Sequence, residues 1–177
     1  MTSPLLLHRA PGAGFEQPFE MLGACHERVE RMLALLERLA QHLPQHGADE
    51  QAAGAARDVM RYFDQAAPLH HEDEERHVFP ALRASGRPEL AALAARLHED
   101  HERMAAAWAA LRATLLEITQ GHWPAGAAFE AVAPFAASCR AHIQAEEDEA
   151  YPSAAGDIVG AARDAMGKEM AARRGLR

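Results

Sequence analysis

The hydrophobic residues of this chain recur every three or four positions, which is the spacing of one face of an α-helix. In the first such segment the apolar stripe contains Leu22, Val29 and Leu33. Histidines share all of these stripes, and glutamates share two of them. The pattern predicts long helices over residues 18–43, 49–83, 87–119 and 125–151.

Helix-breaking residues separate these segments. Pro44 and Gly47 are expected to end the first helix, and Asp49 is suited to cap the second. Pro88 fits the first turn of the third helix. Pro68 lies inside the second predicted helix, where we expect it to kink or loosen the backbone.

Long amphipathic helices joined by short links predict an all-α fold, an up-down-up-down four-helix bundle with an N-terminal arm and a short C-terminal helix. We expect the arm at residues 1–17, the bundle at 18–152 and the tail at 153–177, with the tail helix at about 157–173. A tail helix of this kind either contacts a partner or, more commonly, packs back on its own bundle.

Composition narrows the class of protein. Of the residues, 49% are hydrophobic, and 26 acidic against 18 basic side chains give a net charge of −8, which disfavours nucleic acid as a partner. No run is long and apolar enough for a membrane span, and the first residues do not resemble a secretory signal. Two cysteines make no disulfide framework, so we expect a cytoplasmic protein without a membrane partner. The pattern does not indicate an oligomeric state.

An eleven-residue motif occurs twice, and it is the most specific feature of the sequence. His70 to Pro80 and His142 to Pro152 both read H-x-x-x-E-E-x-x-x-[FY]-P. On a helix, residues four apart lie on one face, so each copy directs an imidazole and a carboxylate the same way. Each copy is preceded by a helix with one histidine on its apolar stripe, His26 or His101.

The repeat thus directs six polar groups inward: His26, His70, Glu74, His101, His142 and Glu146. Burying such groups without partners would cost several kcal/mol. A pair of divalent ions satisfies all of them, because imidazoles supply terminal nitrogens and carboxylates can bridge two ions. We therefore predict a site for two metal ions.

These paired His-x-x-x-Glu-Glu elements, each ending in an aromatic residue and proline, resemble the hemerythrin-like HHE cation-binding family over about residues 18–152. The resemblance implies a non-haem di-iron centre in a four-helix bundle, with Glu74 and Glu146 as bridging carboxylates. Zinc or manganese would accept much of the same donor set.

Oxygen-carrying hemerythrins have two histidines four apart on the third helix and an aspartate on the fourth. Here the third helix has His98 and His101, and the fourth has Glu146. We therefore expect binding or sensing of oxygen or a related diatomic such as nitric oxide, or a role in iron homeostasis. One alternative is a di-iron oxidase, a peroxidase-like enzyme or an iron-centre repair protein, and another is a metal-stabilised interaction module. A binding protein is favoured over an enzyme.

Several neighbouring residues have competing interpretations. His71 with Glu75 has the same spacing as His70 with Glu74, although the distance to Pro80 favours the latter pair. His77, His98 and Glu149 are candidates for further metal ligands or for hydrogen-bond partners of the ligating histidines. Glu75 and Glu147 lie about 100° around their helices from the predicted ligands, so neither is expected to affect metal content. Cys25 and Cys139 are interpreted as small buried hydrophobic residues.

Overall fold

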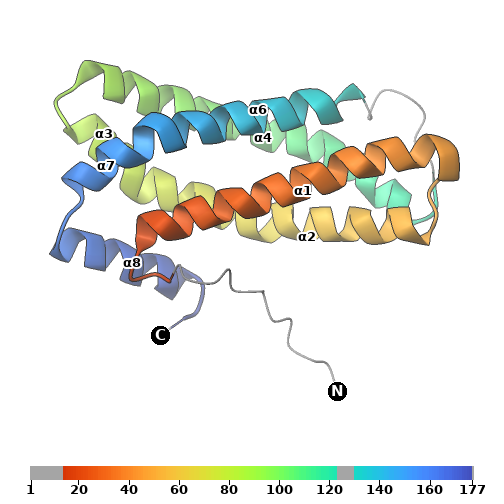
Figure 1. Ribbon diagram of the computed structural model, residues 1–177, viewed down its shortest axis with the longest axis horizontal. Coiled ribbons are helices and arrows are strands. Elements are labelled where there is room, and N and C mark those ends of the chain that lie inside the picture. Colours follow the sequence, from red (N-terminus) through yellow and green to blue (C-terminus); the bar gives the residue numbers. More distant parts are fainter. Residues whose placement is uncertain (1–13, 123–129, 177) are drawn as a thin grey trace.

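The structure, a computed structural model, describes residues 14–122 and 130–176. Within these ranges every regular element is helical, which confirms the all-α prediction. Long helices lie side by side along the molecule (Figure 1): α1 (Pro18–His46), α2 (Glu50–Asp73), α4 (Pro88–Thr119) and α6 (Val132–Ala145). Both α2 and α6 pack against α1 and α4, so the four enclose a common core.

Most helix termini follow the predicted signals. Asp49 caps α2, because its side chain accepts a hydrogen bond of 2.8 Å from the backbone N–H of Ala52. Pro88 is the first residue of α4. The prediction that Pro44 ends α1 is wrong, since the helix continues to His46. A proline in the last turn removes only one backbone bond, and the helix ends at Gly47, the other residue predicted to end it, which has a φ of 67°.

Two π-helical turns interrupt the predicted second and fourth helices. Turn η1 (Glu74–Val78) joins α2 to α3 (Phe79–Ala84), and turn η2 (Glu146–Ala150) joins α6 to α7 (Tyr151–Asp157). The second helix continues through Pro68, which lies within α2, and widens four residues after His70. A π turn adds a residue to the helix and commonly marks a functional site.

Proline follows each π turn, at the second position of α3 and of α7. The predicted end of the fourth helix at residue 151, just before Pro152, is wrong, because α7 continues through this proline to Asp157. The N–H groups of Phe79 and Tyr151 already bond five residues back, to Glu74 and Glu146. The regular bonding pattern is thus shifted before the proline, whose missing N–H is tolerated there.

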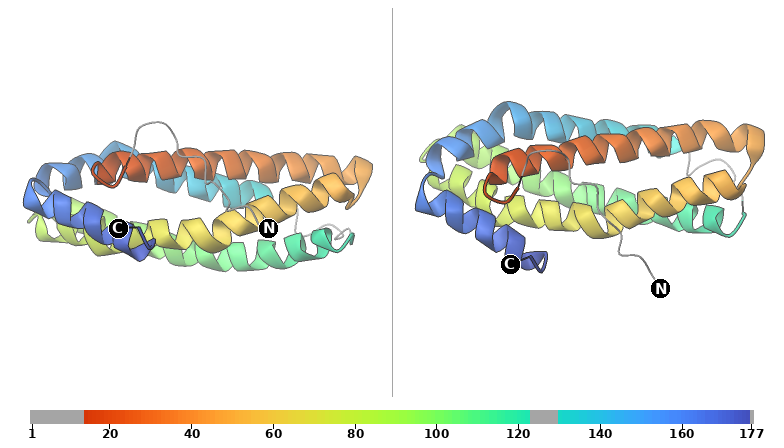
Figure 2. Two further views of the ribbon diagram at one scale, coloured as in Figure 1. Left: turned by 90° about the horizontal axis from the view of Figure 1, so that it is seen from below. Right: turned by 60° about the horizontal axis from the view of Figure 1, so that its bottom comes forward.

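Helix α8 (Ala161–Arg173) begins later than the predicted tail helix and packs against α1. It lies along the side of the bundle near one end, beside the start of α1 (Figures 1 and 2). The predicted start of the fourth helix at residue 125 and the predicted arm up to residue 13 lie outside the described residues.

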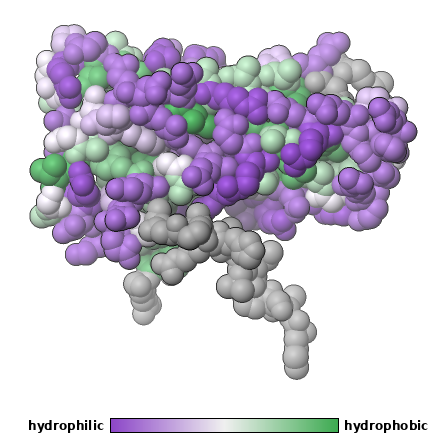
Figure 3. Space-filling view, in the orientation of Figure 1, coloured by the Kyte–Doolittle hydropathy of each residue, from purple (hydrophilic) through white to green (hydrophobic). Residues whose placement is uncertain are grey.

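The core consists of two apolar clusters. One contains Leu33, Phe63 and Phe135, and the other, near α8, contains Leu22 and Phe79. The surface seen in Figure 3 is mainly hydrophilic, with apolar residues scattered over it. In the part of the chain that the structure describes, no helix has both the length and the apolar character needed to cross a membrane.

Candidate metal centre

All six predicted metal-site residues are buried together in the layer between the two apolar clusters. Each of the four long helices positions its histidine between a residue of one cluster and a residue of the other. On α1, for example, His26 lies between Leu22 and Val29, which belong to different clusters. Both glutamates are the first residues of the π turns. The amphipathic stripe of each helix therefore brings its polar member to the same level of the bundle.

The six residues form two groups in which the donor atoms lie within 4.8 Å of one another. One group contains His26 and His70, the other His101 and His142, and both contain Glu74 and Glu146. Within the motif copies, His70 Nε2 lies 3.3 Å from Glu74 Oε1, and His142 Nε2 lies 2.9 Å from Glu146 Oε1.

The carboxylates also reach across to the single histidines of the opposite repeat. His26 Nε2 lies 3.2 Å from Glu146 Oε2, and His101 Nε2 lies 3.4 Å from Glu74 Oε2. Each glutamate thus faces histidines of both groups. This is the arrangement that a bridging carboxylate requires.

Glu75 and Glu147, which were not expected to affect metal content, nevertheless contact two of the predicted ligands. The outer nitrogen of His101, Nδ1, lies 2.8 Å from Glu75 Oε1, and that of His26 lies 2.9 Å from Glu147 Oε1. Such carboxylates fix the orientation of a metal-binding imidazole and increase its basicity. The signal was present in the sequence, because the second glutamate of the motif is repeated in both copies.

The aromatic residues of the motif cover one side of the layer. Tyr151 stacks on His26, with ring centroids 5.3 Å apart, and Phe79 lies 5.3 Å from His101. The Tyr151 hydroxyl donates a hydrogen bond to Glu74 and lies 3.0 Å from His26 Nε2. Sequence reasoning gave Tyr151 no place in the centre, although its position in the repeated motif was visible.

Residues with competing interpretations lie outside the two groups. His71 stacks on His101 at 3.8 Å between ring centroids and belongs to neither group. His98 contacts Glu75 at 3.5 Å, and His77 contacts Glu169 of α8 at 2.7 Å. The side chain of Glu149 is exposed. None of these supplies a donor atom to the groups.

The charges of the layer are compatible with cations. Burial would raise the pKa of Glu74, but the imidazoles of His70 and His101 outweigh burial and hold that pKa well below its usual range. Burial and the charge of Glu74 hold the pKa of Glu146 well above its usual range. Ionising both carboxylates therefore requires additional positive charge, which divalent ions supply.

The imidazoles differ in a related way. Burial lowers the pKa of His70 to about 4, which keeps it in the neutral form that binds metals. For His26 and His101, burial is outweighed by the neighbouring glutamates, so their pKa is raised. Both oxygens of Glu146 and Oε2 of Glu74 have no hydrogen-bond partner although they are buried. Buried carboxylate oxygens without a hydrogen-bond partner fit a metal-binding site.

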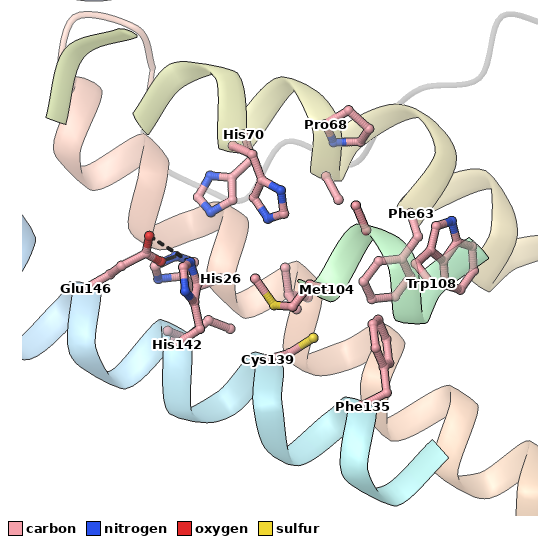
Figure 4. A pocket seen from close by; sticks show the side chains of 15 residues that line it. His26, Phe63, Pro68, His70, Met104, Trp108, Phe135, Cys139, His142 and Glu146 are labelled. Carbon is pink, nitrogen blue, oxygen red and sulfur yellow. Dashed lines mark ion pairs between the residues drawn. The ribbon is translucent and has the colours of Figure 1, made fainter. Parts of the chain in front are cut away.

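A cavity of about 100 Å³ adjoins the opposite side of the layer (Figure 4). His26, His70, His142 and Glu146 form one end of its wall, whereas Glu74 and Tyr151 are not part of it. The rest of the wall is mainly apolar and includes Phe63, Met104, Trp108 and Phe135. The layer thus has an aromatic cover on one side and an apolar cavity on the other.

The cysteines behave as small hydrophobic residues. Burial raises the pKa of the Cys25 thiol to about 11 and that of Cys139 to about 12, so both are protonated near neutrality. A protonated buried thiol is a poor nucleophile and a poor metal ligand.

Two comparisons with known proteins bear on this site. The family model described as the hemerythrin HHE cation binding domain matches residues 17–154. A protein of Haemophilus influenzae, described as an uncharacterized protein, is 36% identical over 106 residues. That match covers 60% of this chain and 61% of the relative, so the chain spans less than two thirds of the relative's length.

Proposed function

Because the chain belongs to the hemerythrin HHE cation binding domain family, we propose that it is a metal-binding protein with a carboxylate-bridged di-iron centre. In this proposal the centre binds or senses oxygen or a related diatomic such as nitric oxide. The proposal includes an up-down-up-down arrangement of the long helices. It treats Glu74 and Glu146 as bridges and the four histidines as terminal ligands.

The observation that supports a pair of ions is the sharing of both glutamates by both donor groups. A single ion would need only one of these groups, and the other would remain buried without a partner. Mixed imidazole and carboxylate donors are typical of non-haem iron. Zinc or manganese would bind to much of the same set, so the identity of the metal is part of what the experiment tests.

The surroundings of the centre support a small neutral ligand. A di-iron pair supplies exchangeable electrons and an open coordination position for such a ligand when it is bound. Phe79 of α3 and Tyr151 of α7 cover the layer on one side. On the other side, the cavity leaves His26, His70 and Glu146 accessible. An apolar wall admits uncharged diatomic molecules and limits the access of ions.

Metal analysis and spectroscopy test this proposal. Protein made in iron-sufficient cells should contain about two irons per chain, and its absorption spectrum should change on exposure to oxygen or nitric oxide. Protein that cannot take up iron anaerobically would overturn the di-iron assignment. If the absorption spectrum of the iron-loaded protein does not change with either gas, ligand binding is overturned and the metal has a structural role.

A further inference from the structure

The cavity beside the centre is larger than a diatomic ligand requires. Its volume is about 100 Å³, whereas one water molecule, similar in size to a diatomic, occupies about 30 Å³ of the liquid. An apolar cavity of about 150 Å³ is large enough to hold benzene. By this comparison the present cavity accommodates about four or five non-hydrogen atoms.

The wall of the cavity indicates the chemistry of such an occupant. Figure 4 shows Phe63, Trp108 and Phe135 at one end and the polar residues at the other, with Met104 between them. Burying an ionised group against this wall would cost several kcal/mol. The occupant is therefore uncharged and mainly apolar.

Three residues of the wall have buried polar atoms without a hydrogen-bond partner: His70, His142 and Glu146. The Glu146 oxygens belong to the predicted metal site, and His142 Nδ1 lies 3.5 Å from Asp100 Oδ2, which leaves His70 Nδ1 for an occupant. His70 lines the cavity and is almost fully buried, and its Nδ1 has no hydrogen-bond partner. Its Nε2 faces Glu74, so Nδ1 is the nitrogen directed away from the predicted ligand set. Metal-bound histidines almost always donate their second N–H, as His26 and His101 can to Glu147 and Glu75. The unpartnered Nδ1 of His70 is thus a donor for an oxygen atom of an occupant.

The cavity also has a route to the surface. Pro68 of α2 and Ala105 of α4 are exposed residues that line it. Beside them, the Trp108 indole N–H donates to Asp64 Oδ1 at 3.0 Å, and Arg112 Nε donates to Asp64 Oδ2 at 2.8 Å. This network fixes the position of Trp108, and the exposed Pro68 and Ala105 mark an opening of the cavity between α2 and α4.

We propose that the cavity is a binding site for a small uncharged organic molecule of about four or five non-hydrogen atoms, with an apolar body and one acceptor oxygen, as in a short alcohol, aldehyde or ketone. This proposal rests on the proposed function in one respect, the presence of metal ions at one end of the cavity. The organic molecule would bind beside the centre, in addition to a diatomic ligand.

The test follows the Met104 methyl group by NMR in zinc-loaded protein with labelled methionines, titrated with 1-butanol. The size-matched control is n-butylammonium, which is charged and is not a metal ligand. We expect a saturable shift of the Met104 signal with a Kd on the order of 1 mM for 1-butanol, and binding at least about tenfold weaker for n-butylammonium. Met166 and Met170 belong to the other apolar cluster, and their signals should not move.

Variants locate the site. Ala67 is buried in the cavity wall, so Ala67→Leu should fill the cavity and weaken butanol binding at least about tenfold. Ala105→Trp should do the same from the mouth, and it keeps the test valid if Ala67→Leu folds poorly. Ala106→Trp, at an exposed neighbour outside the wall, should bind as the unmodified chain does.

Equal shifts with both probes, shifts at Met166 as large as at Met104, or unchanged binding in both filling variants would overturn the proposal. Metal content is measured on each sample. A chain without metal that still binds butanol at Met104 would contradict the proposed function alone, and a metal-loaded chain without butanol binding would contradict the cavity alone.

Discussion

At the scale of single residues, the two glutamates of each motif copy have different tasks. Glu74 and Glu146 belong to both donor groups, whereas Glu75 and Glu147 contact the outer nitrogens of His101 and His26. The first pair is positioned to hold metal directly. The second pair is positioned to orient two imidazoles of the predicted site.

Alanine variants should separate these tasks. Glu74→Ala and Glu146→Ala should each lose metal at both positions, because each carboxylate serves both groups. Glu75→Ala and Glu147→Ala should still bind two ions at saturation, with about 10- to 100-fold lower affinity. Metal titration against a competing chelator measures both effects, with Glu149→Ala, at an exposed position of the same turn, as the control. Two full sites in Glu74→Ala would refute the bridging assignment.

The affinity for metal should fall as the pH falls. The glutamates around His26 and His101 raise the pKa of both imidazoles above the ordinary value of 6.5, so both keep their protons to a higher pH. Metal must displace those protons, and affinity should therefore rise with pH and level off above the raised pKa values. Chelator competition between about pH 5.5 and 8.5 measures this. A flat profile would show that neither imidazole binds metal.

Much of the site could be predicted from the spacing of residues, and some could not. Periodicity indicated that six polar groups share inward faces, and the structure brings all six together; their binding of metal stays a prediction. The contacts of Glu75, Glu147 and Tyr151 depend on which helices cross beside them. A single-helix pattern does not contain that information.

At the scale of elements, the sequence predicted helices well and their irregularities poorly. The cap at Asp49 and the first-turn proline at Pro88 are local signals, and both were identified. The π turns were missed because a stripe of period 3.6 reads through one added residue. Two prolines were over-interpreted as breaks, since Pro44 and Pro152 lie inside helices.

Two helical glycines should respond oppositely to alanine. A Cβ on Gly167 of α8 would collide with the backbone carbonyl of Phe15, whereas a Cβ on Gly54 of α2 would meet nothing within 4 Å. Gly54→Ala should stabilise the fold by about 0.5–1 kcal/mol, because alanine is the better helix former. Gly167→Ala should destabilise the fold despite the same gain in helix propensity, since α8 must move away from the backbone of Phe15.

Urea unfolding of the metal-free protein measures both glycine variants on one scale. A stabilising Gly167→Ala would mean that α8 does not pack closely on the segment before α1.

At the scale of the whole molecule, α8 packs back on the bundle through a buried charge. Asp73, the last residue of α2, is fully buried and pairs with Arg173 and Arg174 at the end of the tail. Burial raises the pKa of Asp73, and the two guanidinium groups partly offset that increase. Because Asp73 precedes Glu74, the tail supports the backbone that carries a predicted ligand.

Removing both arginines should therefore be costly. Arg173→Met with Arg174→Met leaves Asp73 buried without a cation, and the free energy of unfolding should fall by about 3 kcal/mol. Asp73→Asn should restore part of the loss, because the amide carries no charge. Arg57→Ala, which removes a surface pair with Glu50, should cost less than about 1 kcal/mol. Urea unfolding compares the variants, and equal costs would show that the tail contributes no special stability.

The exchange of ligands between repeats has an evolutionary consequence. Each donor group takes two histidines and a glutamate from one half of the chain and borrows one glutamate from the other half. A homodimer of either half would build the same set of donors, but every substitution would then occur twice. In one polypeptide the halves can diverge, as Tyr151 and Phe79 have done beside equivalent histidines. Carrying both halves on one polypeptide thus allows the two predicted ion positions to differ in chemistry.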